Sequence, residues 1–144
     1  MTIDEIRSSF PNGFHDSYLL NINLDYANEM ATLLFQIVLS SAADSVKVIF
    51  RSGHLKLSGL LYFAIEPPSG SFTKEYVPGD DRMWITSDTS DFSSLTFSDV
   101  HPRPRLPEPL PDQSFQHFFY SSSHNSCIYL AAMDASFEWV DEPK

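Results

Sequence analysis

Residues 18–39 read YLLNINLDYANEMATLLFQIVL, and this stretch decides the fold class. In its first half, large side chains alternate with polar ones. The large side chains of one strand face are then Tyr18, Leu20, Ile22, Leu24 and Tyr26. This period of two is typical of a half-buried strand, and Leu19 interrupts it. Residues 27–29 supply a turn and residues 30–39 a second apolar strand. The stretch therefore predicts a β-hairpin.

The chain on either side of this hairpin is also rich in strand patterns. We expect further strands at residues 46–51, 55–65, 83–85, 94–97, 115–120, 127–132 and 136–140, with a turn at Ser52-Gly53 and a bulge or bend at Gly59. Thr2 and Glu5 have the spacing of a capping box, which predicts a short helical turn within residues 2–9. The fold class is mainly β: a curled antiparallel sheet, a sandwich or a partly open barrel with at most short helices, in a single domain of residues 1–144.

Residues 102–111 hold five prolines. The stretch includes a P-x-x-P from Pro104 to Pro107 with the basic residue Arg103 beside it, which is the pattern of a ligand for proline-binding modules. Inside a folded domain, a stiff extended connection between strands is the simpler interpretation, and we favour it.

The composition limits the classes of partner. With 19 acidic and 9 basic residues the formal net charge is −10, which argues against nucleic acid and against anionic membranes as partners. It is compatible with a basic protein partner and equally with simple solubility. The 42% hydrophobic content excludes a disordered chain.

Cys127 is the lone cysteine, so no internal disulfide can form, and its apolar neighbours predict a buried, inert thiol. No apolar run approaches the roughly 18 residues of a membrane span, and MTIDEIRSSF does not resemble a signal peptide. We therefore expect a cytoplasmic location.

The candidate binding residues fall into two groups, and neither carries a specific motif. The adjacent residues His15 and Asp16 could contribute to a metal site. The better interpretation is that residues 13–16 form a turn whose polar side chains hydrogen-bond backbone groups. Asp80, Asp81, Asp88 and Asp91 form an acidic stretch without the order of a calcium loop, so a solvated loop is expected. We predict no catalytic residues, no metal and no cofactor.

Asn12-Gly13-Phe14-His15-Asp16-Ser17, followed by the alternating strand, resembles the opening of small, mostly uncharacterised bacterial β-proteins with an [FL]-H-D-[AS] element. Some of these proteins are immunity proteins of polymorphic toxin systems, and Phe137-Glu138-Trp139 resembles their aromatic-acidic ends. The resemblance implies a small β-rich fold and toxin neutralisation, and it transfers no catalytic residues.

Three hypotheses follow. The first is a non-enzymatic acidic binding protein, an immunity-type inhibitor of a basic toxin that contacts it through the acidic loop. The second is a small-molecule-binding or enzymatic β-barrel whose aromatic-lined pocket is edged by His15 or His117. The third is a structural protein that forms a homo-oligomer through an unprotected edge strand.

Overall fold

The computed structural model describes residues 1–40, 48–66, 83–92, 109–121 and 126–140. These ranges contain the helix α1 (Ile3–Arg7) and the strands β1 (Tyr18–Asp25), β2 (Met30–Val38), β3 (Phe50–Ile65), β4 (Met83–Trp84), β5 (Ser87–Thr89), β6 (Phe115–Ser121) and β7 (Ser126–Trp139). The expected strand at residues 94–97 and most of the proline-rich stretch lie outside the described residues.

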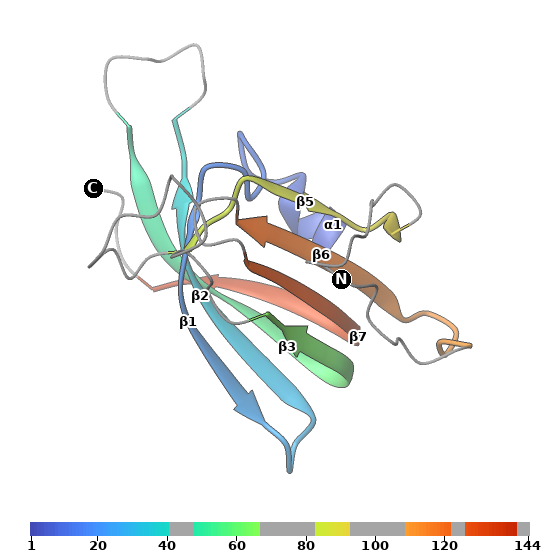
Figure 1. Cartoon of the computed structure of the whole chain (residues 1–144). Coiled ribbons are helices and arrows are strands. Elements are labelled where there is room, and N and C mark those ends of the chain that lie inside the picture. The colour runs from blue at the N-terminus through green and yellow to red at the C-terminus, as the bar shows by residue number, and fades with distance from the viewer. Residues whose placement is uncertain (41–47, 67–82, 93–108, 122–125, 141–144) are drawn as a thin grey trace.

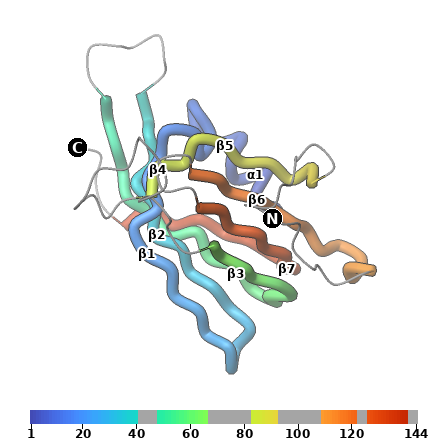
Figure 2. Tube along the Cα trace, viewed as in Figure 1, coloured from blue at the N-terminus to red at the C-terminus, as the bar shows by residue number. Residues whose placement is uncertain are grey.

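The strands form a single seven-stranded sheet in the order β4-β1-β2-β3-β7-β6-β5. All of its pairs are antiparallel. The sheet curls into a half-barrel, and α1 lies beside β5 and β6 (Figures 1 and 2). The prediction of a mainly β protein with a curled antiparallel sheet is confirmed. The capping box is also present, because Thr2 accepts a hydrogen bond from the backbone of Glu5 and the Glu5 side chain accepts one from Thr2.

The predicted hairpin is β1 and β2, joined by a tight turn in which Asp25 pairs with Met30. Asn28 donates two hydrogen bonds to the Asp25 carboxylate, and these lower the pKa of that carboxyl group. The predicted strand face is wrong in part. The register shifts between Leu19 and Asn21, so the bulge turns Leu19 to the core while Tyr26 lies in the turn and is 88% exposed.

β3 and β7 are longer than predicted, and each runs through a position that the sequence indicates as a break. The expected turn at Ser52-Gly53 is wrong: Gly53 is a strand residue paired with Trp139, and the ring of Phe137 occupies the space that a Cβ would need. Gly59 does bend the strand, with a φ of +59°. The segments expected at residues 127–132 and 136–140 are parts of the continuous strand β7.

Residues 83–89 connect the two edges of the sheet. β4 pairs with the start of β1 at one edge and β5 pairs with β6 at the other, with only Ile85 and Thr86 between them. The Ile85 amide donates to the Ser17 carbonyl (2.8 Å) and the Thr86 amide to the Tyr120 carbonyl (2.9 Å). This segment, which we call the clasp, closes one end of the half-barrel and buries Ile85 completely.

The main core lies between the inner face of the sheet and the N-terminal segment. The inner face is defined by its fully buried side chains, which include Leu33, Phe35, Leu55, Leu57, Phe119 and Leu130. Phe14 packs on Phe35 and Phe119 with ring centroids 5.0 and 5.2 Å away, and Ile3 and Ile6 of α1 join the same cluster. Full burial of a side chain of this size contributes about 2–3 kcal/mol, so residues 1–17 are an integral part of the fold.

A second cluster on the opposite face of β6 and β7 contains Phe92, Phe118, Cys127 and Tyr129. Cys127 is a free thiol that is 1% exposed, as predicted. Burial raises its pKa to about 12. No helix in the described ranges is long and apolar enough to cross a membrane.

Candidate functional site

The candidate site is centred on His117, which lies on the inner face of β6 between Phe115 and Phe119. Alternation along β6 turns these three side chains to the same face, so a histidine occupies a position that a core strand normally fills with an apolar residue. The ring of His117 is fully buried and lies 4.8 Å from that of Phe119. A buried imidazole needs polar partners, because burial of an unpaired polar group is costly.

Asp88 is the first of these partners. His117 Nε2 lies 2.7 Å from Asp88 Oδ2, and the Asp88 side chain is only 3% exposed. β5 places Asp88 opposite Phe119, which makes it the diagonal neighbour of His117 on the same face. A carboxylate only accepts hydrogen bonds, so the proton between the two groups belongs to Nε2 of the imidazole.

The other imidazole nitrogen faces Asp4. His117 Nδ1 lies 4.0 Å from Asp4 Oδ1, too far for a hydrogen bond, and this buried nitrogen has no partner among the described residues. Asp4 is in the first turn of α1, where its Oδ2 accepts a hydrogen bond from Ser90. Ser90 therefore directs its hydroxyl proton to Asp4, which makes it unsuited to act as a nucleophile activated by His117.

Arg7, the last residue of α1, is the fourth member of the cluster. Its Nε lies 3.5 Å from Asp88 Oδ2 and its Nη1 lies 3.7 Å from Asp4 Oδ1. One arginine thus faces two carboxylates. With a neutral His117, the four groups Asp4, Arg7, Asp88 and His117 carry a net charge of −1.

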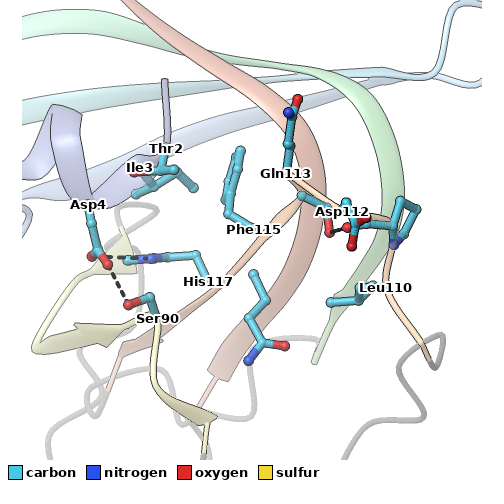
Figure 3. Close-up of a pocket in the computed structure, with 12 residues that line it drawn as sticks. Thr2, Ile3, Asp4, Ser90, Leu110, Asp112, Gln113, Phe115 and His117 are labelled. Atoms are coloured by element: carbon cyan, nitrogen blue, oxygen red, sulfur yellow. Dashed lines mark hydrogen bonds and ion pairs between the residues drawn. The ribbon is translucent and has the colours of Figure 1, made fainter.

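A cleft of about 580 Å³ opens beside this cluster (Figure 3). Its described lining comes from the start of α1, from Ser90 after β5 and from the approach to β6: Thr2, Ile3, Asp4, Ser90, Leu110, Pro111, Asp112, Gln113, Ser114, Phe115, Gln116 and His117. We call it the His117 cleft. Its two charged lining residues within the described part, Asp4 and Asp112, are both negative.

The acidic stretch predicted as a binding loop divides in the structure. Asp80 and Asp81 lie outside the described residues, Asp88 is an interior partner of His117, and Asp91 is exposed. Asp88 is therefore not available as a surface contact. Asp4 and Arg7 were missed by sequence reasoning, and His117 was considered only as the edge of a pocket. A histidine on the apolar face of a predicted strand was the one local signal for this site.

His15 and Asp16 lie away from the inner face, in the turn before β1. His15 Nδ1 is 3.1 Å from Asp16 Oδ2, and Trp84 Nε1 donates to Asp16 Oδ1 (3.1 Å). Asn12 also contacts Asp16, whose φ is +64°. These contacts assign the pair a role in fixing the turn against β4. Across the described ranges, no group of three or more His, Cys, Asp or Glu residues is arranged to hold a metal ion.

Comparisons with known proteins leave the site to be interpreted from its own geometry. No protein-family model matches the chain, and no curated protein matches it. Among solved structures, the chain is similar to an uncharacterized protein from Neisseria gonorrhoeae, with 12% identity over 86% of this chain and 91% of that one and a TM-score of 0.41.

Proposed function

We propose that this protein is a non-enzymatic acidic binding protein that receives a basic protein partner in the His117 cleft. The observation that carries the proposal is the chemistry of the cleft: Asp4 and Asp112 line it, and the buried acceptor His117 Nδ1 lacks a donor within the described residues. A partner that supplies positive charge and N–H donors satisfies both features.

The charge of the whole chain supports the same kind of partner. A net charge of −10 attracts a basic protein over long distances and raises its association rate at low salt. The resemblance of residues 12–17 to immunity proteins supports a more specific role, the neutralisation of a basic toxin. Asp91 is exposed and belongs to the segment that carries Ser90, so it can add to the attraction at the mouth of the cleft.

The test is affinity capture from a lysate of the native host at low and high salt, with mass spectrometry of the eluted proteins. Three baits are compared: wild type, Asp4→Asn/Asp112→Asn in the cleft, and Glu29→Gln/Glu138→Gln as a control that removes the same charge elsewhere. Glu29 and Glu138 are exposed and do not line the cleft. We expect a basic protein on the wild-type and control baits at low salt and much less of it on the cleft variant. Equal retention by the cleft variant would exclude the cleft as the contact.

A small-molecule or enzymatic pocket is the second candidate, because the cleft opens beside a His–Asp pair with a 2.7 Å contact. In such a pair the imidazole can act as a general base, and the carboxylate holds it in a fixed orientation. Ser90 donates to Asp4, so it is not the group that such a base would activate. Thermal-shift screening of small molecules separates this candidate, since a stabilising ligand whose effect disappears in Asp4→Asn would favour it.

Self-association is the third candidate. β4 covers only Tyr18 and Leu19 of β1, so along the described chain Asn21–Asp25 has no strand on its outer side. Such an edge can pair with a second copy. Light scattering over a range of concentrations tests it, and a constant monomeric mass would exclude this route.

A further inference from the structure

We propose that His117 Nδ1 and Asp4 Oδ1 together bind the guanidinium group of an arginine side chain presented by the basic partner. This inference rests on the proposed function and identifies the group that occupies the base of the cleft. The two atoms lie 4.0 Å apart, both are hydrogen-bond acceptors in the tautomer that Asp88 selects, and Nδ1 has no hydrogen-bond partner among the described residues.

Within the described part of the chain, Asp4 Oδ1 accepts no hydrogen bond, although it takes part in an ion pair with Arg7. Oδ2 is used by the Ser90 hydroxyl, whereas Oδ1 faces Arg7 Nη1 at 3.7 Å and His117 Nδ1 at 4.0 Å, both beyond hydrogen-bond distance. The capping box of α1 fixes the backbone beneath Asp4. The carboxylate is thus held at one end of the cleft, where it converges with His117 and Ser90 (Figure 3).

The local charge also favours a bound cation. Asp4, Asp88 and Arg7 sum to −1, and a neutral His117 leaves this charge uncompensated beside a buried ring. Two events can restore neutrality, namely a bound cation or protonation of His117 itself. These alternatives differ in the nitrogen that carries a proton, so they can be distinguished spectroscopically.

A guanidinium fits the site better than an ammonium does. The planar guanidinium presents parallel N–H donors to two separate acceptors. It is also less strongly hydrated than an ammonium, so its desolvation beside the buried nitrogen costs less free energy. The cleft also has apolar lining for the side-chain methylenes, supplied by Ile3, Leu110 and Phe115. The ring of Phe115 can add a cation–π contact. The matching segment of the partner therefore contains an exposed arginine.

The test is a titration of ¹⁵N-labelled protein with four probes, observed through the imidazole nitrogens of His117. The probes are an arginine residue blocked at both ends, the matching blocked lysine, the neutral blocked citrulline, and free arginine. We expect blocked arginine to perturb Nδ1 while Nε2 keeps its proton, and to bind at least about tenfold more tightly than citrulline, as expected for a hydrogen bond to a charged group.

Asp4→Asn should weaken binding of blocked arginine by about tenfold. The matched control Glu138→Gln, an exposed carboxylate paired with Lys56, should leave it unchanged. Preference for lysine, equal binding of citrulline, or a doubly protonated His117 before any probe is added would overturn the inference. Binding of free arginine without binding of the blocked residue would also overturn it, because the ligand would then be a small molecule.

The two proposals can fail separately. If the basic partner is retained through Asp4 and Asp112 but blocked arginine leaves His117 unperturbed, the arginine assignment falls and the proposed function stands. If blocked arginine binds at His117 but the cleft variant retains the partner fully, the proposed function falls.

Discussion

His117 Nε2 and Asp88 Oδ2 lie 2.7 Å apart on the inner face of the half-barrel, where Asp4 and Arg7 approach from one side and the apolar side chains of the core surround the rest. The contact joins a short edge strand to β6 and selects the protonated nitrogen of the imidazole. This pair determines the chemistry of the cleft, because it leaves Nδ1 of His117 as an acceptor.

Loss of Asp88 should therefore destabilise the fold. We expect Asp88→Ala to lower the free energy of unfolding by about 1–3 kcal/mol, since it leaves a buried N–H of His117 without an acceptor. Asp88→Asn keeps a neutral acceptor and should lower it less. Urea denaturation measures both, with the exposed Asp91→Ala as the control. A loss in Asp88→Ala no larger than that of the control would show that the buried contact contributes nothing.

Truncation of Ile85 in the clasp should also destabilise the fold. Ile85 is fully buried between the sheet edges, so Ile85→Ala should cost about 2–5 kcal/mol and Ile85→Val about 0.5–1.5 kcal/mol. Thermal or urea unfolding measures the series. If both variants unfold like wild type, the segment does not close the half-barrel in the way described.

Gly53 should not tolerate a side chain. A Cβ at this position would lie 2.3 Å from Cζ of Phe137, so Gly53→Ala should destabilise the fold by about 1–3 kcal/mol through overpacking. Phe137→Leu should relieve part of that loss when the two changes are combined. A double-mutant cycle of unfolding free energies measures the coupling, and strictly additive losses would contradict the proposed clash.

Cys127 gives the protein a dependence on alkaline pH. Burial raises the pKa of its thiol from 9.0 to about 12, and burial together with the Cys127 contact raises that of Tyr129. A raised folded-state pKa stabilises the protein fully below the unfolded pKa and loses this contribution as pH rises from about 9 towards 12. We expect Cys127→Ala to flatten the decline in stability over this window. We also expect the native thiol to resist alkylation at pH 8, and rapid alkylation there would contradict its burial.

The sequence predicts elements whose information is local. The alternation over residues 18–26 and the turn before Met30 identify the β1–β2 hairpin, and the spacing of Thr2 and Glu5 identifies the cap of α1. The bulge after Leu19 could only be suspected, because the register depends on the partner strand. The local pattern at Ser52-Gly53 predicts a turn, because the long-range contact of Gly53 with Phe137 has no signature in the neighbouring residues.

The site could not be assembled from sequence for the same reason. Its members come from α1, β5 and β6, and only the curl of the sheet brings Asp4, Asp88 and His117 together. The acidic neighbours of Asp88 along the chain predict an exposed loop, whereas alternation on the edge strand β5 turns Asp88 to the core. The one local signal for the site is that His117 shares a face of the predicted strand 115–120 with Phe115 and Phe119.

The most direct test of the central claim is the association rate of the captured basic partner with wild type, Asp4→Asn/Asp112→Asn and Glu29→Gln/Glu138→Gln as a function of ionic strength. The account predicts that the cleft variant associates about tenfold more slowly at low salt and with a weaker salt dependence, while the control stays near wild type. Equal rates and equal salt slopes for the two variants would contradict it, because the effect would then come from net charge and not from the cleft.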